Sequence, residues 1–370
     1  MKTLNFRQVN RLKYIQMHQS IGAQYLGNNQ CCFTIWAPFA QSIQIVITEP
    51  EERKEALTLQ KGGYWQQTLD NIPPGTRYFV EINEEMLRPD PASFSQPDGV
   101  HEGSEVIDPN AIQWRDEDWK NIPLEDMIQY ELHVGTFTPE GTFEGVAQKL
   151  DYLLDLGINT IELMPVGQFP GGRNWGYDGV YPFAVQNTYG GPEGLKKLVN
   201  ACHEKGIAVI LDVIYNHLGP EGNYLREFGP YFTDKYHTPW GEALNFDEHY
   251  SDEVRNFFIQ NALMWFRDYH IDGLRLDAVH AILDMSAKPF LQELAEEVEK
   301  LSREIGKPCH LIPESDLNDV KLIRSLENYG FELHAQWLDD FHHALHALVT
   351  GEQQGYYQDF GRLEDLVKAV

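Results

Sequence analysis

The sequence predicts an α/β protein in which a small β-sandwich precedes a TIM-type (β/α) barrel that is incomplete at its C-terminal end. Short strand patterns occupy residues 21–88, and strands that alternate with helices begin at Met127. The chain has 370 residues, which suggests two or three domains. We therefore expect an N-terminal extension over 1–20, an immunoglobulin-like sandwich with its connector over 21–110, and the first six barrel units over 111–370.

The N-terminal strand patterns are short and are separated by turn signals. Apolar and polar residues alternate from Phe33, and residues 42–48 are rich in Ile and Val. The run Pro73-Pro74-Gly75 marks a turn between two such segments. Several short strands at this spacing are typical of a β-sandwich. Residues 88–110 are rich in Pro and Gly and predict a connector rather than a core element.

The barrel prediction rests on repeated strand and helix patterns. Strands are predicted over 127–134, 158–166, 207–217, 271–279, 309–315 and 330–340, and helices over 143–157, 194–206, 251–270, 288–305 and 341–351. Such repetition implies parallel strands with right-handed crossovers. No glycine-rich phosphate turn follows an early strand, which disfavours a doubly wound sheet. A full barrel has eight units, so the chain is expected to stop before strand seven.

Charge and composition exclude several classes of function. Lys and Arg total 29 and Asp and Glu total 56, which gives a formal net charge of −27. This balance argues against nonspecific nucleic-acid binding and against an anionic membrane surface as a partner. No apolar run is long enough for a transmembrane helix, and the first residues lack the apolar core of a secretory signal. With four cysteines and no disulfide framework, a cytoplasmic location is expected.

Candidate functional side chains collect at the C-terminal ends of the predicted strands, where barrel enzymes hold their active sites. Asp277 ends the fourth strand and Glu314 the fifth, so the two carboxylates could approach to about 5 Å. That separation suits a retaining glycosidase, which uses one carboxylate as nucleophile and one as acid/base. Arg275 points the same way as Asp277 and would keep it ionised. From spacing alone, ion pairs lining a barrel mouth explain these residues equally well.

Three ordered motifs carry a family resemblance. The segments 212–217 (DVIYNH), 273–280 (GLRLDAVH) and 312–316 (IPESD) resemble motifs of glycoside hydrolase family 13, the α-amylase family. Further segments resemble one subgroup of this family, malto-oligosyltrehalose trehalohydrolase. These segments are YELHVGTFTPEGTF, NWGYDGVYPF, YHTPWGEALNFD and DDFHHALHALVTGE. The N-terminal segment resembles the carbohydrate-binding-module-like sandwich that precedes the barrel in these enzymes and in branching enzymes. The resemblance covers residues from about 21 to 370.

The resemblance implies a role for each matched residue. Asp277 matches the nucleophile, Glu314 the general acid/base, and Arg275 the arginine that holds the charge of the nucleophile. The remaining matched or neighbouring positions would contact the sugar or support the site: Tyr177 by stacking, His217 by hydrogen bonding, His280 as a sugar contact, Asp212 as a structural partner and Trp175 as an exposed aromatic. For Tyr177 and Trp175, local packing of a loop is the alternative, and Trp240 is a weaker candidate of the same kind.

One feature of the family is missing from the sequence. The third carboxylate of the family follows a His at the end of strand seven, and no His-Asp pair occurs in this chain. Asp339 and Asp340 belong to the segment of the sixth strand and do not match that motif. Loss of the carboxylate would remove contacts that hold and distort the sugar ring. We therefore expect a truncated or split form, for which a missing C-terminal half or a partner chain supplies the other strands.

The resemblance implies a retaining α-glucan hydrolase that acts on malto-oligosaccharides. It would cleave the α-1,4 bond next to the terminal trehalose of malto-oligosyltrehalose and release trehalose, with no cofactor and no metal. A 1,4-α-glucan branching enzyme and a catalytically inactive glucan-binding fragment remain open as alternatives. Asp212 and Asn216 resemble positions near the calcium site of many amylases, although the subgroup is not expected to need calcium. His342 and His346 are four residues apart on a predicted helix, but a structural role is expected because no convincing third ligand lies nearby.

Overall fold

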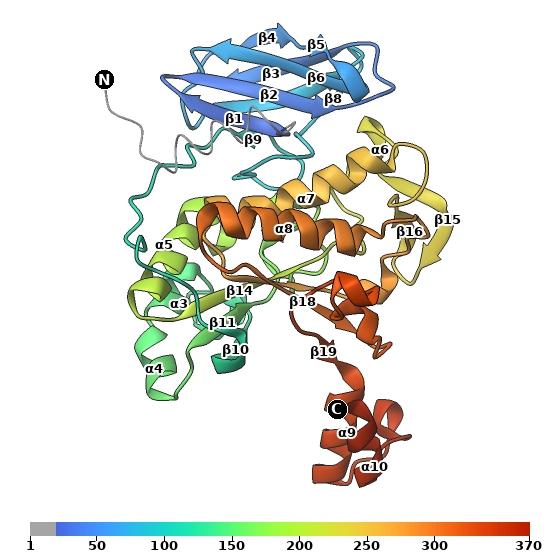
Figure 1. Cartoon of the computed structure of the whole chain (residues 1–370). Helices are drawn as coiled ribbons and strands as arrows, with labels where there is room; N and C mark the ends of the chain where they lie inside the picture. Colours follow the sequence, from blue (N-terminus) through green and yellow to red (C-terminus); the bar gives the residue numbers. More distant parts are fainter. Residues whose placement is uncertain (1–19) are drawn as a thin grey trace.

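The computed structural model describes residues 20–370, so the predicted extension over 1–20 lies outside the described residues except for Ser20. Figure 1 shows a two-layered sandwich packed on a larger α/β part, from which a pair of C-terminal helices projects. The predicted fold class, a sandwich followed by an open (β/α) barrel sheet, is confirmed for these residues. In the described part of the chain, no helix is long and apolar enough to cross a membrane.

Two antiparallel sheets form the sandwich. One sheet has the order β1-β2-β6-β5, and the other has the order β4-β3-β7-β8 with β9 paired to β7. The strands are β1 Gly22–Gly27, β2 Gln30–Trp36, β3 Ile43–Glu49, β4 Arg53–Ala56, β5 Thr58–Leu59, β6 Tyr64–Asp70, β7 Arg77–Ile82, β8 Met86–Arg88 and β9 Ser104–Glu105. Phe33 and Tyr78 come from different sheets, and their ring centroids are 5.0 Å apart. Inward-facing residues of both layers therefore share one core.

Six parallel strands form the barrel sheet in the predicted order, β10-β11-β14-β17-β18-β19. They are β10 Gln129–Leu132, β11 Thr160–Leu163, β14 Ala208–Val213, β17 Gly273–Leu276, β18 His310–Ser315 and β19 Trp337–Leu338. The prediction of a long sixth strand over 330–340 is wrong. Tyr329 and Glu332 have positive φ angles of 59° and 62°, which interrupt an extended backbone before β19 begins.

Most predicted helices are present with similar bounds: α5 Gly191–Glu204, α7 Ser251–Asp268, α8 Phe290–Ile305 and α9 Asp339–Thr350. The single helix predicted over 143–157 is instead two, α3 Phe143–Ala147 and α4 Leu150–Asp155. The break falls at Lys149, whose φ of −103° and ψ of 1° are not helical. Elements that the sequence did not predict are β9, which lies in the segment predicted as a connector, and α2 Val134–Phe137, β12 Gly167–Gln168, β13 Tyr181–Val185, α6 Leu225–Phe228, β15 Phe232–Thr238, β16 Gly241–Leu244 and α10 Leu363–Ala369.

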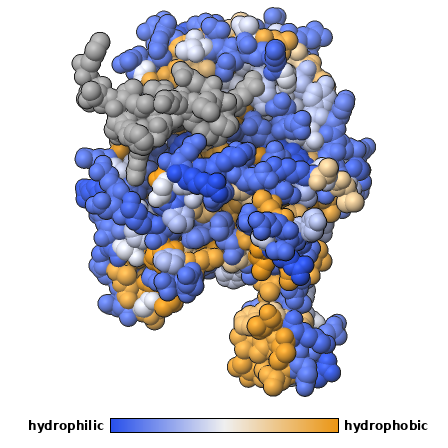
Figure 2. All heavy atoms as spheres, viewed as in Figure 1, coloured by the Kyte–Doolittle hydropathy of each residue, from blue (hydrophilic) through white to orange (hydrophobic). Residues whose placement is uncertain are grey.

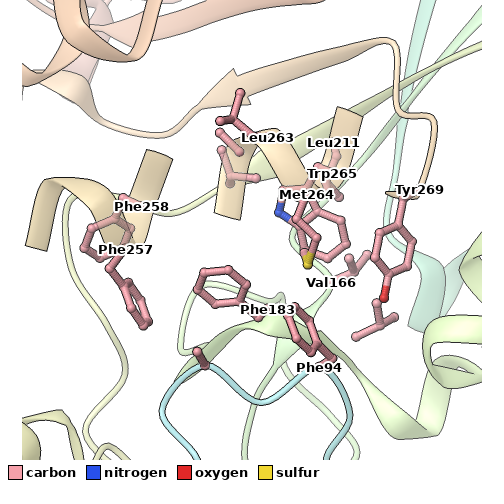
Figure 3. Packing of buried hydrophobic residues seen from close by; sticks show 14 of the residues in the cluster. Phe94, Val166, Phe183, Leu211, Phe257, Phe258, Leu263, Met264, Trp265 and Tyr269 are labelled. Carbon is pink, nitrogen blue, oxygen red and sulfur yellow. The ribbon is translucent and has the colours of Figure 1, made fainter. Parts of the chain in front are cut away.

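Aromatic side chains join the sandwich and its connector to the barrel. Phe183 on β13 lies between Phe94 of the connector and Phe257 of α7 (Figure 3), with ring centroids 5.9 Å and 5.0 Å away. The sandwich and the barrel residues belong to one continuous buried cluster. Arg88 also forms a two-pronged ion pair with Glu227, with nitrogen–oxygen distances of 2.5 Å and 3.2 Å. The two parts are therefore packed as one unit, which fixes the sandwich relative to the barrel.

A buried charge network closes the N-terminal end of the barrel sheet. The fully buried carboxylate of Asp272, just before β17, accepts hydrogen bonds from His203 Nε2 (2.8 Å), Trp119 Nε1 (2.8 Å) and Lys307 Nζ (3.0 Å). His203 also donates through Nδ1 to Asp116 at 3.0 Å. The network therefore ties the connector, α5 and the entrances to β17 and β18 together.

Helices α9 and α10 carry exposed apolar side chains. Figure 2 shows this apolar face as an orange surface on the projecting C-terminal pair. It includes Phe341, Leu345, Val349, Leu363 and Val367. The positions recur at intervals of four residues, so each helix presents one apolar side. Contiguous exposed apolar surface is typical of regions that contact another chain segment.

Candidate active site

The C-terminal ends of three neighbouring strands bring the predicted carboxylates around one arginine. Arg275 lies on β17, and its Nη1 is 2.7 Å from Asp277 Oδ1 and 2.9 Å from Asp212 Oδ2. Its Nη2 is 3.6 Å from Glu314 Oε2 on β18. The two candidate catalytic carboxylates, Asp277 and Glu314, therefore border the same guanidinium group. Their side chains are 12% and 17% exposed, so each remains accessible from one side.

Asn216 holds the candidate nucleophile in one orientation. Its Nδ2 donates hydrogen bonds of 2.8 Å to both the side-chain Oδ2 and the backbone oxygen of Asp277. Because Arg275 contacts the other carboxylate oxygen, both oxygens of Asp277 have a fixed partner. From the sequence, Asn216 was named as a residue near a calcium position and was not assigned this role. Its place beside His217, at the end of a strand adjacent to β17, was the available signal.

The backbone after Asp277 contacts the candidate acid/base. The Ala278 N–H donates a 2.8 Å hydrogen bond to Glu314 Oε2. Ala278 adopts a left-handed conformation with φ 41° and ψ 52°, which is uncommon for a residue with a side chain. This turn aims the amide at the neighbouring strand. Glu314 is therefore held by the peptide group that directly follows the candidate nucleophile.

The barrel interior holds more carboxylates than cations. Burial raises the pKa of Asp212 well above its usual value, although Arg275 opposes the shift. Burial also raises the pKa of Glu162 on β11 to about 7, and Gln129 donates a hydrogen bond to it. Burial disfavours the charged form of Arg275, but Asp212 and Asp277 outweigh this and raise its pKa. Arg275 therefore stays cationic, whereas Glu162 is only partly ionised near neutral pH.

Tyr177 and His217 adjoin the carboxylates, and their predicted contacts with a sugar stay predictions. The Tyr177 hydroxyl donates to Asp212 Oδ2 at 3.1 Å, and its backbone oxygen accepts from His217 Nε2 at 3.0 Å. The ring of His217 stacks on Trp240 of the β15–β16 hairpin, with centroids 4.6 Å apart and planes inclined by 9°. Burial lowers the pKa of His217, so the ring is neutral at pH 7. The stacking indicates that Trp240 borders the site.

Trp175 lies further from the carboxylates. Its side chain is 60% exposed, and its ring is 4.8 Å from that of His133 at the end of β10. His133 is itself held by Asn174, whose backbone oxygen accepts from its Nε2 at 2.8 Å. The structure therefore places Trp175 on an exposed loop at the C-terminal side of the sheet, with a free aromatic surface.

His280 and Asp316 meet beside the two carboxylates. His280 lies in the short 3-10 helix Val279–Ala281, and its Nδ1 is 3.3 Å from Asp316 Oδ1. The sequence named His280 but missed Asp316. The spacing in the sequence could have identified Asp316, because it follows Glu314 by two residues and lies directly after the end of β18.

Within residues 20–370, no group of three or more His, Cys, Asp or Glu side chains could hold a metal ion. The rings of His342 and His346 on α9 are 6.0 Å apart, and His346 Nε2 lies 2.9 Å from Glu352 Oε2. The structural role expected for this histidine pair stays a prediction.

Two family models match the chain. Residues 20–111 match the carbohydrate-binding module 48, also described as the isoamylase N-terminal domain. Residues 91–240 match the catalytic domain of alpha amylase. The first match covers the sandwich with its connector, and the second begins in the connector and includes β10, β11 and β14 of the barrel sheet.

Curated relatives extend the similarity to most of the chain. A malto-oligosyltrehalose trehalohydrolase of Saccharolobus solfataricus is 51% identical over 341 residues, which are 91% of this chain and 58% of the relative. A protein of the same name from Arthrobacter ramosus is 50% identical over 339 residues. The 1,4-alpha-glucan branching enzyme GlgB of Bacillus cereus is 32% identical over 77% of this chain. The chain thus spans between a half and three fifths of the length of these relatives.

Solved structures share the arrangement of sandwich and barrel. The crystal structure of a provisionally named alpha amylase from Salmonella typhimurium matches 95% of this chain with a TM-score of 0.86 and 39% identity, over 59% of that chain. A pullulanase from Anoxybacillus sp. LM18-11 matches with a TM-score of 0.67 at 24% identity, which shows the fold alone. The family models, the curated relatives and the Salmonella typhimurium structure agree that the chain is similar to the α-amylase family of glycoside hydrolases.

Proposed function

We propose that this chain carries the active site of a retaining α-glucan hydrolase that cleaves the α-1,4 bond next to the terminal trehalose of malto-oligosyltrehalose. The observation that carries the proposal is the contact of Asp277 and Glu314 with one guanidinium at adjacent strand ends. The relatives named malto-oligosyltrehalose trehalohydrolase support the substrate. A cytoplasmic location and a partner chain that completes the barrel stay predictions.

The proposed reaction proceeds by two displacements with net retention. In the first step, an Asp277 oxygen attacks the anomeric carbon and forms a glycosyl ester, while Glu314 gives its proton to the leaving glycosidic oxygen. In the second step, Glu314 takes a proton from water, and the resulting hydroxide displaces Asp277 from the anomeric carbon. Arg275 and Asn216 hold the Asp277 carboxylate at the attack position. The neutral His217 and the ring of Tyr177 would contact the sugar at the cleavage site.

The reaction products distinguish the proposed hydrolase from its main alternative, a branching enzyme. The chain is expected to release free trehalose from maltotriosyltrehalose and to produce the new reducing end in the α configuration. Chromatography of the products and proton NMR of the anomeric signal within the first minutes measure both results. A branching enzyme, which the 32% identical relative favours, would instead form α-1,6 branch points. Branch formation without trehalose release would contradict the proposal, and binding without turnover would favour the inactive glucan-binding alternative.

The proposed mechanism predicts a bell-shaped pH dependence of kcat/KM. The nucleophile must be ionised and the acid must be protonated, so one protonation state limits the rate on each side of the optimum. Initial rates between about pH 4 and pH 9 test this, with circular dichroism at each pH as the control for folding. A rate that stays constant across that range would contradict the assignment of two carboxylates with opposite protonation states.

A further inference from the structure

The pair of His280 and Asp316 lies on the side of the site where the leaving saccharide must be. Glu314 protonates the leaving oxygen in the proposed mechanism, so the leaving saccharide lies beside Glu314 rather than beside Asp277. His280 follows Asp277 by three residues, and the turn between them donates the Ala278 amide to Glu314. Asp316 follows Glu314 by two residues on the neighbouring strand end. The pair therefore borders Glu314 from both strands.

The contact geometry restricts which edge of the His280 ring faces outward. Nδ1 is buried, and within the described residues it makes no well-aligned hydrogen bond, while Asp316 Oδ1 lies 3.3 Å away. The His280 side chain is nevertheless 27% exposed, so its exposed surface belongs to side-chain atoms other than Nδ1. A carboxylate beside Nδ1 favours the tautomer with the hydrogen on Nδ1. Nε2 of a neutral ring is then an acceptor for a hydroxyl group.

Asp316 has the freedom to improve this contact. Its side chain is 53% exposed, and the following connection to β19 begins with the exposed Leu317. A small movement of the carboxylate would align it with the Nδ1–H of His280. The charged acceptor would then fix both the rotation and the tautomer of the ring.

We infer that Asp316 is a positioning residue that orients His280 to accept a hydroxyl of the leaving saccharide. The inference rests on the proposed function and deepens it, because it assigns part of the recognition of the trehalose unit to this pair. Asp316 itself takes no part in bond cleavage. Its removal is therefore expected to weaken binding of a leaving saccharide and to affect the chemical step far less.

Two substrates separate these effects. The leaving group of maltotriosyltrehalose is the disaccharide trehalose. The leaving group of α-maltosyl fluoride is a fluoride ion, so this substrate places no sugar on the leaving side. Asp316→Ala is expected to lower kcat/KM for maltotriosyltrehalose about tenfold more than kcat/KM for the fluoride, mainly through KM. Asp316→Asn, which keeps an acceptor, should restore part of the loss. Glu327→Ala, which removes an exposed carboxylate on the same connection between β18 and β19, is the matched control.

A double-mutant cycle tests whether Asp316 acts through His280. If it does, adding Asp316→Ala to His280→Ala should cause little further loss on maltotriosyltrehalose. Equal losses on both substrates, or additive losses in the cycle, would overturn the inference. If the parent chain hydrolyses neither substrate, the proposed hydrolysis fails, and the same cycle is measured on the Kd for maltotriosyltrehalose by calorimetry. A parent that does not bind this saccharide overturns the inference as well.

Discussion

Asp277→Asn is expected to lower the turnover of maltotriosyltrehalose by roughly 10⁴-fold or more, because no glycosyl ester can form without the carboxylate. The amide is nearly the same size, so the contacts of Asn216 with the backbone are kept and glucan binding should persist. Initial rates of trehalose release measure the loss, and calorimetry measures binding. Asp234→Asn, on the exposed side of the β15–β16 hairpin, is the control that should keep full activity.

Glu314→Gln distinguishes the two catalytic roles within the same experiment. It is expected to slow hydrolysis of maltotriosyltrehalose by about 10²- to 10⁴-fold, the range for loss of a general acid. Formation of the glycosyl ester from α-maltosyl fluoride should be slowed much less, since fluoride leaves without protonation. Asp277→Asn should block both substrates. Hydrolysis retained by Asp277→Asn, or identical behaviour of the two variants on the fluoride, would refute the assignment of nucleophile and acid.

Asp272→Asn is expected to lower the free energy of unfolding by about 3–5 kcal/mol, the cost of removing one partner from a buried ion pair. The asparagine cannot offer charged acceptors to His203, Lys307 and Trp119 together, and it places an NH2 group among donors. Urea unfolding followed by circular dichroism measures the loss. The control is Asp151→Asn, which breaks a largely exposed ion pair with Lys205 at the end of α5 and should cost at most about 1 kcal/mol.

The pH dependence of that difference follows from the shifted groups. Burial opposes ionisation of Asp272, but Lys307 and His203 outweigh it and lower its pKa, so its contribution is lost as the pH falls below about 4. Burial lowers the pKa of His203, but Asp116 and Asp272 raise it overall, so its contribution is lost as the pH rises above about 6.5. The difference between parent and Asp272→Asn should therefore be largest between about pH 4 and 6.5. A difference that grows steadily up to pH 9 would contradict this network.

The sequence predicted the fold correctly where a single periodic pattern of residues determines the type of secondary structure. Alternation of apolar and polar residues predicted the sandwich, and the repetition of strand and helix patterns predicted the parallel barrel sheet. The predicted ends of strands and helices were wrong where individual backbone angles determine where an element stops. Glu332 has a positive φ and shortens the sixth strand, and a non-helical Lys149 divides the helix over 143–157. The β15–β16 hairpin was also missed, because its residues carry no strict alternation.

In the candidate site, the residues of sequence motifs could be predicted, whereas the contacts between them could not. Asp277 and Glu314 were named because each lies at the end of a predicted strand and because the motifs around them resemble those of the α-amylase family. The role of Asn216, the contact of Asp316 with His280 and the amide of Ala278 were not identifiable. Each depends on where a turn directs a side chain or a peptide group, and a turn of a few residues leaves many directions open. Trp240 was a weak candidate until its stacking on His217 placed it at the site.

The left-handed turn at Ala278 has a consequence for engineering this protein. In the proposed mechanism, residues 277–281 supply the attacking oxygen, the amide that holds the proton donor, and the imidazole that faces the departing sugar. A substitution that shifts this short segment would disturb all three at once, so combinations of changes there should be strongly epistatic. Laboratory evolution toward other glucans is therefore expected to spare this segment. Beneficial changes should instead accumulate along residues 317–328 and in the β15–β16 hairpin, where single positions can vary alone.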